Sequence, residues 1–368
     1  MTEGNAALTE GNAALVERIP VTVLTGYLGA GKTTLLNRIL SEDHGRRYAV
    51  IVNEFGEIGI DNDLILNTDE ELFEMNNGCI CCTVRGDLIR TMHGLLSKSA
   101  DTAKAFDAII VETTGLADPG PVAQTFFVDH FLQSRTFLDS VTTVVDAKHI
   151  RLRLADSREA AEQIAFADQI VLNKTELVSD QELRDIEARL RKLNPLAPIH
   201  RAQRSNVPLD KVLGRGGFDL ERIVSLEPDF LDPADNAVHG QAGHVHDEHC
   251  GHDHDAHSHE HDHEHDSGIH SISLVCHTPM DGSRVELWLN GLVASKGQDI
   301  LRAKGIIDVK GEDRRLVFQA VHMLLEGDLQ RPWKPDEPRY SRLVFIGRNL
   351  DEQALQTGFQ SCKAVADG

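Results

Sequence analysis

Eight residues near the N-terminus have the types and spacing of a phosphate-binding loop. The run Gly26-Tyr27-Leu28-Gly29-Ala30-Gly31-Lys32-Thr33 matches G-x-x-x-x-G-K-[ST] and lies between a strand pattern and a helical pattern. Glycines let backbone N–H groups surround a phosphate, and the helix start adds positive potential. We expect Lys32 to contact the β- and γ-phosphates and Thr33 to offer its hydroxyl to Mg²⁺. The predicted nucleotide contacts here are Gly26, Gly29, Ala30, Gly31, Lys32, Thr33 and Thr34.

A second motif indicates which base the nucleotide carries. Asn173-Lys174-Thr175-Glu176 ends an apolar strand pattern and resembles the N-K-x-D guanine motif, with Glu in place of Asp. The Glu176 carboxylate could accept hydrogen bonds from guanine N1–H and from the exocyclic amine, and adenine offers no such pair of donors. The sequence therefore favours GTP over ATP, with Asn173, Lys174 and Glu176 as base-binding residues. A helix-capping polar turn is the structural alternative for these four residues.

A third candidate is the acid at the end of the apolar run 108–112. Glu112 is followed by Thr113-Thr114-Gly115, so it takes the place of a Walker B carboxylate with a phosphate-sensing glycine after it. We expect Glu112 to hold Mg²⁺, directly or through water, and the Gly115 N–H to meet the γ-phosphate. An ordinary turn at a strand end is the alternative. Together with Lys32, these two residues are the predicted catalytic set.

Three thiols crowd a short segment between the phosphate loop and Glu112. Cys79, Cys81 and Cys82 occur in Gly78-Cys79-Ile80-Cys81-Cys82. Thiolates are soft ligands suited to Zn²⁺, Co²⁺ or Cu(I), and three sulfurs leave one tetrahedral position for water, Glu54 or a partner's residue. A turn must bring Cys82 to the other two, because a straight strand would point it away. Buried thiols that merely fill a core, or a redox pair, are the alternatives.

The element pattern predicts an α/β fold for the first part of the chain. Short apolar runs at 21–25, 49–53, 108–112, 141–146, 169–173 and 199–201 alternate with helical patterns such as 33–40, 87–98 and 180–193. Near-continuous Val, Ile and Leu in such runs is typical of a mainly parallel sheet covered on both faces. We assign residues 19–228 to this phosphate-binding domain and residues 1–18 to a disordered tail.

A histidine-rich linker and a second domain follow. Residues 223–283 contain no Lys or Arg and 13 Asp or Glu, so this stretch carries 13 of the chain's 21 excess negative charges. Its composition, with little to bury, predicts a disordered linker at 229–267. Apolar alternation returns at 269–275, 315–321 and 342–346, with helical patterns near 285–292 and 351–359, which predicts a small α+β domain over 268–368. Ten linker histidines form a predicted loose metal reservoir: His244, His246, His249, His252, His254, His257, His259, His261, His263 and His265.

Charge and cysteine usage narrow the class of protein. The chain has 368 residues and a net charge of −21, which argues against nucleic acid as a partner because neutralising phosphates needs clustered Lys and Arg. No segment approaches the roughly 18 to 20 apolar residues of a membrane span, and no signal-peptide pattern opens the chain. Six cysteines in this length do not form a secreted disulfide framework. We expect a cytoplasmic protein with reduced thiols and no membrane partner.

Taken together, these motifs resemble the CobW-type GTPases, a metallochaperone branch of the P-loop GTPases. The resemblance covers nearly the whole chain from about residue 19: GYLGAGKTT at 26–34, NEFGEIGID at 53–61, NGCICCTVRGDL at 77–88, ETTGLADPGP at 112–121 and LNKTE at 172–176. The stretches LRAKGIID at 301, RRLVFQAVH at 314, RPW at 331 and RLVFIGRNLD at 342 are similar to the C-terminal domain of that family. The GCICC segment beside a phosphate loop is the family's hallmark.

The resemblance implies slow, Mg²⁺-dependent hydrolysis of GTP coupled to binding of a transition metal, zinc or possibly cobalt, and its delivery to a client metalloprotein. It assigns Lys32 and Thr33 to the phosphates and Mg²⁺, and Asn173, Lys174 and Glu176 to guanine. It assigns Cys79, Cys81, Cys82 and Glu54 to the transported metal. The coupling is physically plausible, because the thiol segment lies where GTPase switch regions lie and would be ordered by the γ-phosphate.

Two other functions fit parts of the sequence. The protein could store or buffer zinc through the histidine-rich linker, with the GTPase as a sensor, because alternating imidazoles and carboxylates bind zinc in many loose combinations. It could also be a P-loop kinase for a small molecule, although the guanine-type motif at 173–176 weakens that reading.

Overall fold

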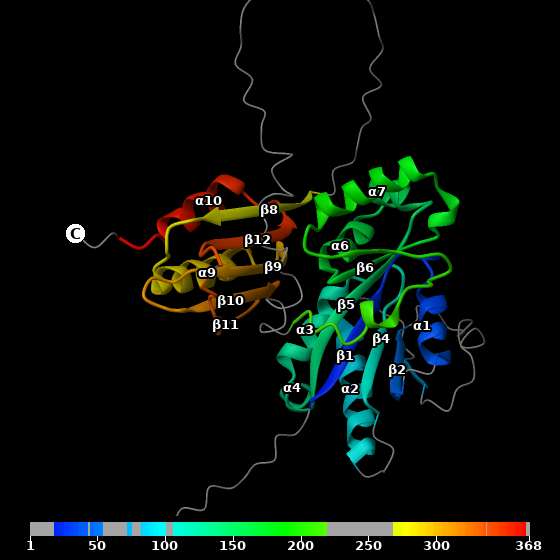
Figure 1. The fold of residues 1–368 in the computed structure, drawn as a ribbon. Coiled ribbons are helices and arrows are strands. Elements are labelled where there is room, and N and C mark those ends of the chain that lie inside the picture. The colour runs from blue at the N-terminus through cyan, green and yellow to red at the C-terminus, as the bar shows by residue number, and fades with distance from the viewer. Residues whose placement is uncertain are drawn as a thin grey trace, which may run out of the picture.

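The computed structural model describes residues 18–42, 45–53, 72–75, 82–100, 106–218, 268–335 and 337–365. They form two sheets with their helices (Figure 1). The predicted tail and linker, which include the ten reservoir histidines, lie outside these residues, so both remain predictions. No helix among the described residues has the length and apolar character needed to cross a lipid bilayer.

The first sheet has seven strands, all parallel, in the order β3-β2-β4-β1-β5-β6-β7. Its strands are β1 (Ile19–Thr25), β2 (Tyr48–Asn53), β3 (Leu72–Met75), β4 (Ala108–Glu112), β5 (Thr136–Asp146), β6 (Gln169–Asn173) and β7 (Ile199–Arg201). The helices between them are α1 (Lys32–Ser41), α2 (Cys82–Ala100), α3 (Pro119–Val128), α4 (His130–Arg135), α5 (Ile150–Asp156), α6 (Arg158–Phe166) and α7 (Asp180–Leu193). Two 3-10 turns follow β6 and β7: η2 (Thr175–Leu177) and η3 (Leu209–Lys211).

Both faces of this sheet are covered, as the apolar strands require. Alternate residues of β4 belong to different apolar clusters: Ile109 packs with α2 and α3, whereas Ile110 packs with Leu35 and Leu36 of α1. Successive side chains of a strand point to opposite faces, so the two clusters lie on opposite sides of the sheet. All strands run the same way, so their C-terminal ends share one edge, from which the loops of the candidate site extend.

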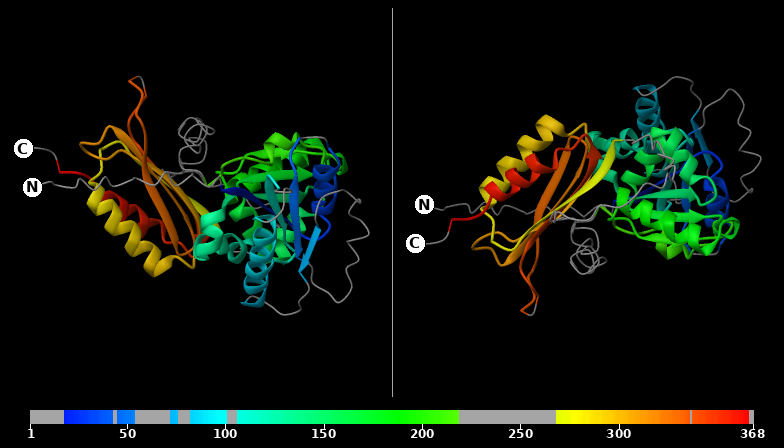
Figure 2. Two further views of the ribbon diagram at one scale, coloured as in Figure 1. Left: turned by 90° about the horizontal axis from the view of Figure 1, so that it is seen from below. Right: turned by 90° about the horizontal axis from the view of Figure 1, so that it is seen from above.

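The second sheet is antiparallel, in the order β11-β10-β9-β12-β8. Its elements are β8 (Ile269–Cys276), α9 (Gly282–Lys296), β9 (Ile300–Ile307), β10 (Arg314–Val321), β11 (Leu324–Pro332), β12 (Ser341–Arg348) and α10 (Glu352–Ser361). Helices α9 and α10 lie side by side on one face (Figure 2), where Leu289 and Phe359 pack against Phe345. Val344 and Ile346 of β12 instead join an apolar cluster of the first domain.

Buried charges also join the two domains. Asp168, which precedes β6, is ion-paired with Arg302 of β9 and lies 3.3 Å from Nζ of Lys304. The Asp168 carboxylate also accepts a hydrogen bond of 2.9 Å from the backbone N–H of Val141. All three charged side chains are at most 2% exposed. At a second point of contact, Arg348 of β12 lies 3.2 Å from the Glu162 carboxylate of α6.

The predicted fold class is confirmed, and the differences lie in individual elements. β4, β6, β7 and α7 have the predicted bounds, while α2 begins at Cys82, five residues earlier than expected. Three strands, β3, β9 and β11, were not predicted from the sequence. β3 has only four residues, and β9 carries Arg302 and Lys304 among its apolar residues, which hid its strand pattern.

Candidate functional site

The phosphate loop connects β1 to α1 at the C-terminal edge of the parallel sheet. Gly26, Gly29 and Gly31 have φ angles of 140°, 74° and 110°, a backbone region that favours glycine. A Cβ atom on Gly31 would lie 2.4 Å from the side-chain nitrogen of Asn173, so glycine also lets the two predicted nucleotide loops approach each other. Nζ of Lys32 lies 2.9 Å from the Gly26 carbonyl oxygen, inside the turn of the loop.

The predicted magnesium ligands lie together. β1 and β4 are adjacent and in register, with Leu24 opposite Glu112, so the phosphate loop and the residues after Glu112 leave the sheet side by side. The Thr33 hydroxyl donates a 3.4 Å hydrogen bond to the Glu112 carboxylate. Neighbouring oxygens around an octahedral Mg²⁺ with bonds of 2.0–2.1 Å lie about 3 Å apart. A hydroxyl and a carboxylate at this spacing are a donor set that fits Mg²⁺.

The predicted base-binding motif is bonded directly to the phosphate loop. The side chain of Asn173 donates to the Ala30 carbonyl oxygen at 2.9 Å and accepts from the backbone N–H of Ser205 at 2.7 Å. Nζ of Lys174 donates to the Gly29 carbonyl oxygen at 2.7 Å. Glu176 is exposed in η2, so its carboxylate is open to a ligand. Residues from β6 and from the phosphate loop thus form one connected surface.

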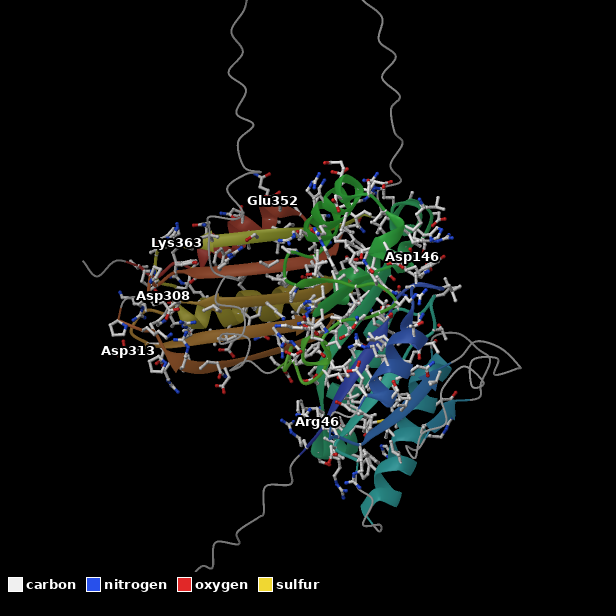
Figure 3. All side chains as sticks on the ribbon, turned by 45° about the vertical axis from the view of Figure 1, so that its right-hand side comes forward. Arg46, Asp146, Asp308, Asp313, Glu352 and Lys363 are labelled. Atoms are coloured by element: carbon white, nitrogen blue, oxygen red, sulfur yellow. The ribbon has the colours of Figure 1, made fainter. Side chains whose placement is uncertain are left out.

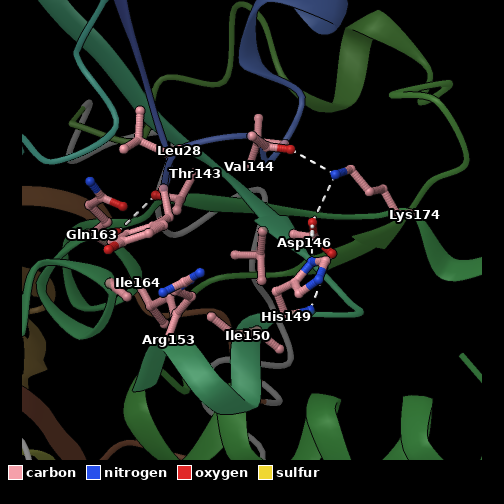
Figure 4. A pocket seen from close by; sticks show the side chains of 14 residues that line it. Leu28, Thr143, Val144, Asp146, His149, Ile150, Arg153, Gln163, Ile164 and Lys174 are labelled. Carbon is pink, nitrogen blue, oxygen red and sulfur yellow. Dashed lines mark hydrogen bonds and ion pairs between the residues drawn. The ribbon is translucent and has the colours of Figure 1, made fainter. Parts of the chain in front are cut away.

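Two side chains of this surface were not among the predicted site residues. Asp146, at the end of β5, is labelled in Figure 3. Its carboxylate lies 2.8 Å from Nζ of Lys174 (Figure 4). Burial opposes ionisation of Asp146, but hydrogen bonds from Lys174 and His149 outweigh it and lower its pKa. Ser205 follows β7, and its hydroxyl donates to the Gly31 carbonyl oxygen at 3.0 Å. Asp146 ends an apolar strand as Glu112 and Asn173 do, and that position could have singled it out.

A cavity of about 240 Å³ lies beside the phosphate loop. Tyr27 and Leu28 form one wall, and side chains of α5 and α6 form another (Figure 4). On the α5 side, the Arg153 guanidinium lies 5.1 Å from the centroid of the Tyr27 ring. Gln163 of α6 reaches the segment after Glu112, donating to the carbonyl oxygens of Gly115 and Ala117 at 3.1 Å each.

The predicted thiol site falls mostly outside the described residues. Glu54, Cys79 and Cys81 lie outside them, and Cys82 is the first residue of α2. The strands that lead to these residues are described: β2 ends at Asn53, β3 ends at Met75, and these two residues are register partners. The described strands that precede Glu54 and the cysteine segment therefore end side by side at the same edge of the sheet. The described parts of the chain contain no cluster of three or more His, Cys, Asp or Glu that could hold a metal ion.

Comparison with known proteins agrees with these motifs along most of the chain. The CobW/HypB/UreG nucleotide-binding domain matches residues 20–201, and the C-terminal domain of the cobalamin synthesis protein cobW matches residues 269–363. The zinc chaperone YjiA of Escherichia coli (strain K12) is 35% identical over 342 residues, covering 93% of this chain and 98% of that protein. The chain belongs to the CobW family of P-loop GTPases.

Other CobW-family proteins are similar over comparable lengths. Zinc-regulated GTPase metalloprotein activator 1 of Schizosaccharomyces pombe is 32% identical over 362 residues, covering 91% of this chain and 84% of that protein. A solved structure of Zn(II)-bound YjiA GTPase from E. coli is 32% identical and superimposes with a TM-score of 0.70, covering 94% of this chain and 99% of that one. A Zn(II)-bound triple mutant of YjiA, in which one glutamate and two adjacent cysteines are replaced by alanine, superimposes with a TM-score of 0.72.

Proposed function

We propose that this CobW-family GTPase is a metallochaperone that binds zinc, or cobalt, at Cys79, Cys81 and Cys82 with Glu54 and transfers it to a client metalloprotein in the cytoplasm. The observation that carries the proposal is the pairing of Asn53 with Met75. This pairing starts the two metal-ligand segments next to each other, on the sheet edge that also carries the phosphate loop. Metal binding and nucleotide binding are therefore expected to influence each other.

The nucleotide side of the proposal rests on the bonded loops described above. Lys32 would contact the β- and γ-phosphates, the Gly115 N–H would contact the γ-phosphate, and Thr33 with Glu112 would hold Mg²⁺. A bound Mg²⁺ supplies positive charge that stabilises phosphate oxygens as negative charge develops on them. Asn173 and Lys174 would hold the base-binding loop against the phosphate loop, leaving Glu176 to accept the two guanine donors. Thr34 would also contact the nucleotide, because it directly follows Thr33 in the phosphate-binding motif.

The metal side rests on ligand chemistry and on the relatives. Thiolates favour zinc, and a site with three of them keeps one exchangeable position from which a client could take the metal. Several relatives carry the name zinc chaperone, and YjiA has been solved with Zn(II). Zinc is present even in the YjiA mutant that lacks two adjacent cysteines, so any test here must separate the Cys79–Cys82 site from other zinc ligands.

Zinc buffering by the ten linker histidines is the second candidate function. It is favoured by the composition of 239–265, where imidazoles alternate with carboxylates. Because imidazoles bind metals only when neutral, the capacity of this reservoir should fall as the pH drops below about 6.5. A metal capacity that is unchanged between about pH 7.5 and pH 5.5 would exclude histidine as the main ligand.

One titration separates the two functions. Zinc affinity is measured on a variant lacking residues 239–265, without nucleotide, with GDP and with a non-hydrolysable GTP analogue. A metallochaperone should retain one tight site whose affinity differs at least about tenfold between the GDP and GTP-analogue states, a coupling of about 1.4 kcal/mol. Cys81→Ala should abolish that site, and the control Cys276→Ala, a buried thiol of the C-terminal domain, should not. Equal affinities in all three states would exclude nucleotide gating, and loss of most zinc capacity on linker deletion would favour buffering.

A further inference from the structure

The side chain of Gln163 is buried between the two parts of the nucleotide site. It is 1% exposed, in α6, and its Nε2 donates to the carbonyl oxygens of Gly115 and Ala117, each at 3.1 Å. A side-chain amide has two N–H donors, so both hydrogen bonds can form at once. Ala117 also donates its backbone N–H to the Thr114 carbonyl oxygen at 3.1 Å, which closes a turn. Gln163 therefore fixes the conformation of the 114–117 turn from outside it.

The other side of this turn presses against the phosphate loop. A Cβ atom on Gly115 would lie 2.6 Å from the backbone nitrogen of Leu28 and 2.8 Å from its Cα. No side chain fits in that space, so the backbone of Gly115 is held between Leu28 on one side and Gln163 on the other. A sideways shift of Gly115 therefore requires the Gln163 hydrogen bonds to break or α6 to move.

Helix α6 is itself anchored at several points. The Gln163 carbonyl oxygen accepts a 2.8 Å hydrogen bond from the hydroxyl of Thr143 in β5. The neighbouring Glu162 lies 3.2 Å from Arg348 of the C-terminal domain. At the end of the helix, the ring of Phe166 lies 5.2 Å from that of His322, centroid to centroid. Because α6 is tied to the sheet and to the second domain, it offers Gln163 a fixed base.

We propose that Gln163 is a positioning residue that holds the Gly115 N–H where a γ-phosphate will lie and thereby distinguishes GTP from GDP. The inference rests on the proposed role of Gly115. GDP has no γ-phosphate, so its binding does not depend on this turn. In this role Gln163 acts through the turn that it holds, by its hydrogen bonds to the Gly115 and Ala117 carbonyl oxygens.

The test compares two nucleotides in one variant. Gln163→Met keeps the length and bulk of the side chain but removes both donors. We expect the affinity for a non-hydrolysable GTP analogue to fall about tenfold, which corresponds to about 1.4 kcal/mol, while GDP affinity changes less than about twofold. We also expect kcat for GTP to fall, because the turn is no longer held in place during hydrolysis. Gln163→Asn, which keeps a polar amide but is one methylene too short, should show the same selective loss and serves if the Met variant is unstable.

Gln169→Met is the matched control. Gln169 is also buried and hydrogen-bonded, to His200 at 2.9 Å, but it starts β6 at the opposite end of the strand from Asn173. Its replacement should leave the ratio of GTP-analogue to GDP affinity unchanged. Equal losses for both nucleotides at Gln163, or no loss in either variant, would overturn the positioning role. A wild-type protein that binds GDP and the GTP analogue equally would instead contradict the proposed role of Gly115 itself.

Discussion

The two sheets place their polar residues in opposite ways. In the parallel sheet, Glu112, Asp146 and Asn173 are the last residues of their strands, so their side chains meet the loops that could surround a ligand. In the antiparallel sheet, Arg302 and Lys304 lie inside β9 and are buried against Asp168 of the first domain. Polar groups at the ends of strands thus lie among the loops of the candidate nucleotide site. Charge in the middle of a strand is already neutralised by the neighbouring domain.

The largest expected effect is a loss of stability, and it tests the buried charges of β9. Asp168→Ala leaves Arg302 and Lys304 buried without their carboxylate, and removing one partner of a buried ion pair costs about 3–5 kcal/mol of unfolding free energy. Chemical denaturation measures this loss. The control Asp185→Ala removes an exposed ion pair with Arg151 and should cost at most about 1 kcal/mol. If both variants lost equal stability, the contrast between buried and exposed charge would be wrong.

The next effect tests the strand-end site. Lys32→Ala removes the cation expected at the phosphates and should lower kcat/KM for GTP at least about 100-fold. The free energy of unfolding should change less than in Asp168→Ala, because Lys32 donates hydrogen bonds to carbonyl oxygens within its own loop, whereas Asp168 joins the two domains. GTP hydrolysis assays test this directly. The control variant Lys334→Ala replaces an exposed lysine of the C-terminal domain and should hydrolyse GTP at the wild-type rate.

Base selection gives a smaller effect. Glu176→Ala removes the carboxylate expected to accept two guanine donors, and such charged hydrogen bonds contribute about 1.5–3 kcal/mol. GTP affinity should fall about tenfold or more while ATP affinity stays the same, so competition binding should show a lower GTP preference. Glu286→Ala, an exposed acid on α9, is the control. An unchanged preference in Glu176→Ala would favour the structural reading of residues 173–176 as a polar turn.

The smallest expected effect is on the pH dependence of stability. It concerns His322, whose ring contacts that of Phe166 in the first domain. Burial lowers the pKa of His322, and the nearby Asp118 carboxylate and two backbone hydrogen bonds oppose this only in part. The unfolded chain therefore binds the proton more readily, so stability is full above about pH 6.5 and falls as the pH drops below it. His322→Asn suits the positive φ of 50° at this position and removes the titrating group.

Thermal unfolding with a chelator present should show a smaller stability loss between about pH 7.5 and pH 5.5 in His322→Asn than in wild type. His200, whose pKa burial also lowers, contributes equally to both proteins and cancels in the difference. The control His277→Asn changes an exposed histidine and should retain the wild-type pH dependence. A wild-type pH dependence in His322→Asn would show that His322 does not titrate with unfolding.

Local patterns made the strand-end site predictable. The phosphate loop and the motif at 173–176 are contiguous, and each follows an apolar strand, so Lys32, Glu112 and Asn173 could be found from spacing alone. The contacts of Ser205 and Gln163 depend on residues 174 and 48 positions away in the chain, and no local pattern encodes them.

Two strands of the C-terminal domain, β9 and β11, also lack a clear local pattern. In β9, Arg302 and Lys304 interrupt the apolar pattern. They can be buried because both lie against Asp168, which is 134 positions away from Arg302 in the chain. β11 is largely solvent-facing, with Glu326 and Asp328 among its exposed residues, so burial left little pattern to read. A strand whose charges are neutralised by another domain can be recognised only when the contacts with that domain are known.

The apolar cluster shared by the domains bears on how the chain folds as it is synthesised. Once residue 218 has been made, all seven strands of the parallel sheet exist, but Leu301, Val344 and Ile346, which complete that cluster, do not. At about 5–20 residues per second, a ribosome needs on the order of ten seconds to reach them. During that interval the nascent first domain lacks these partners for its apolar cluster, so chaperones that recognise apolar surface on nascent chains should bind it most strongly between synthesis of residues 218 and 346.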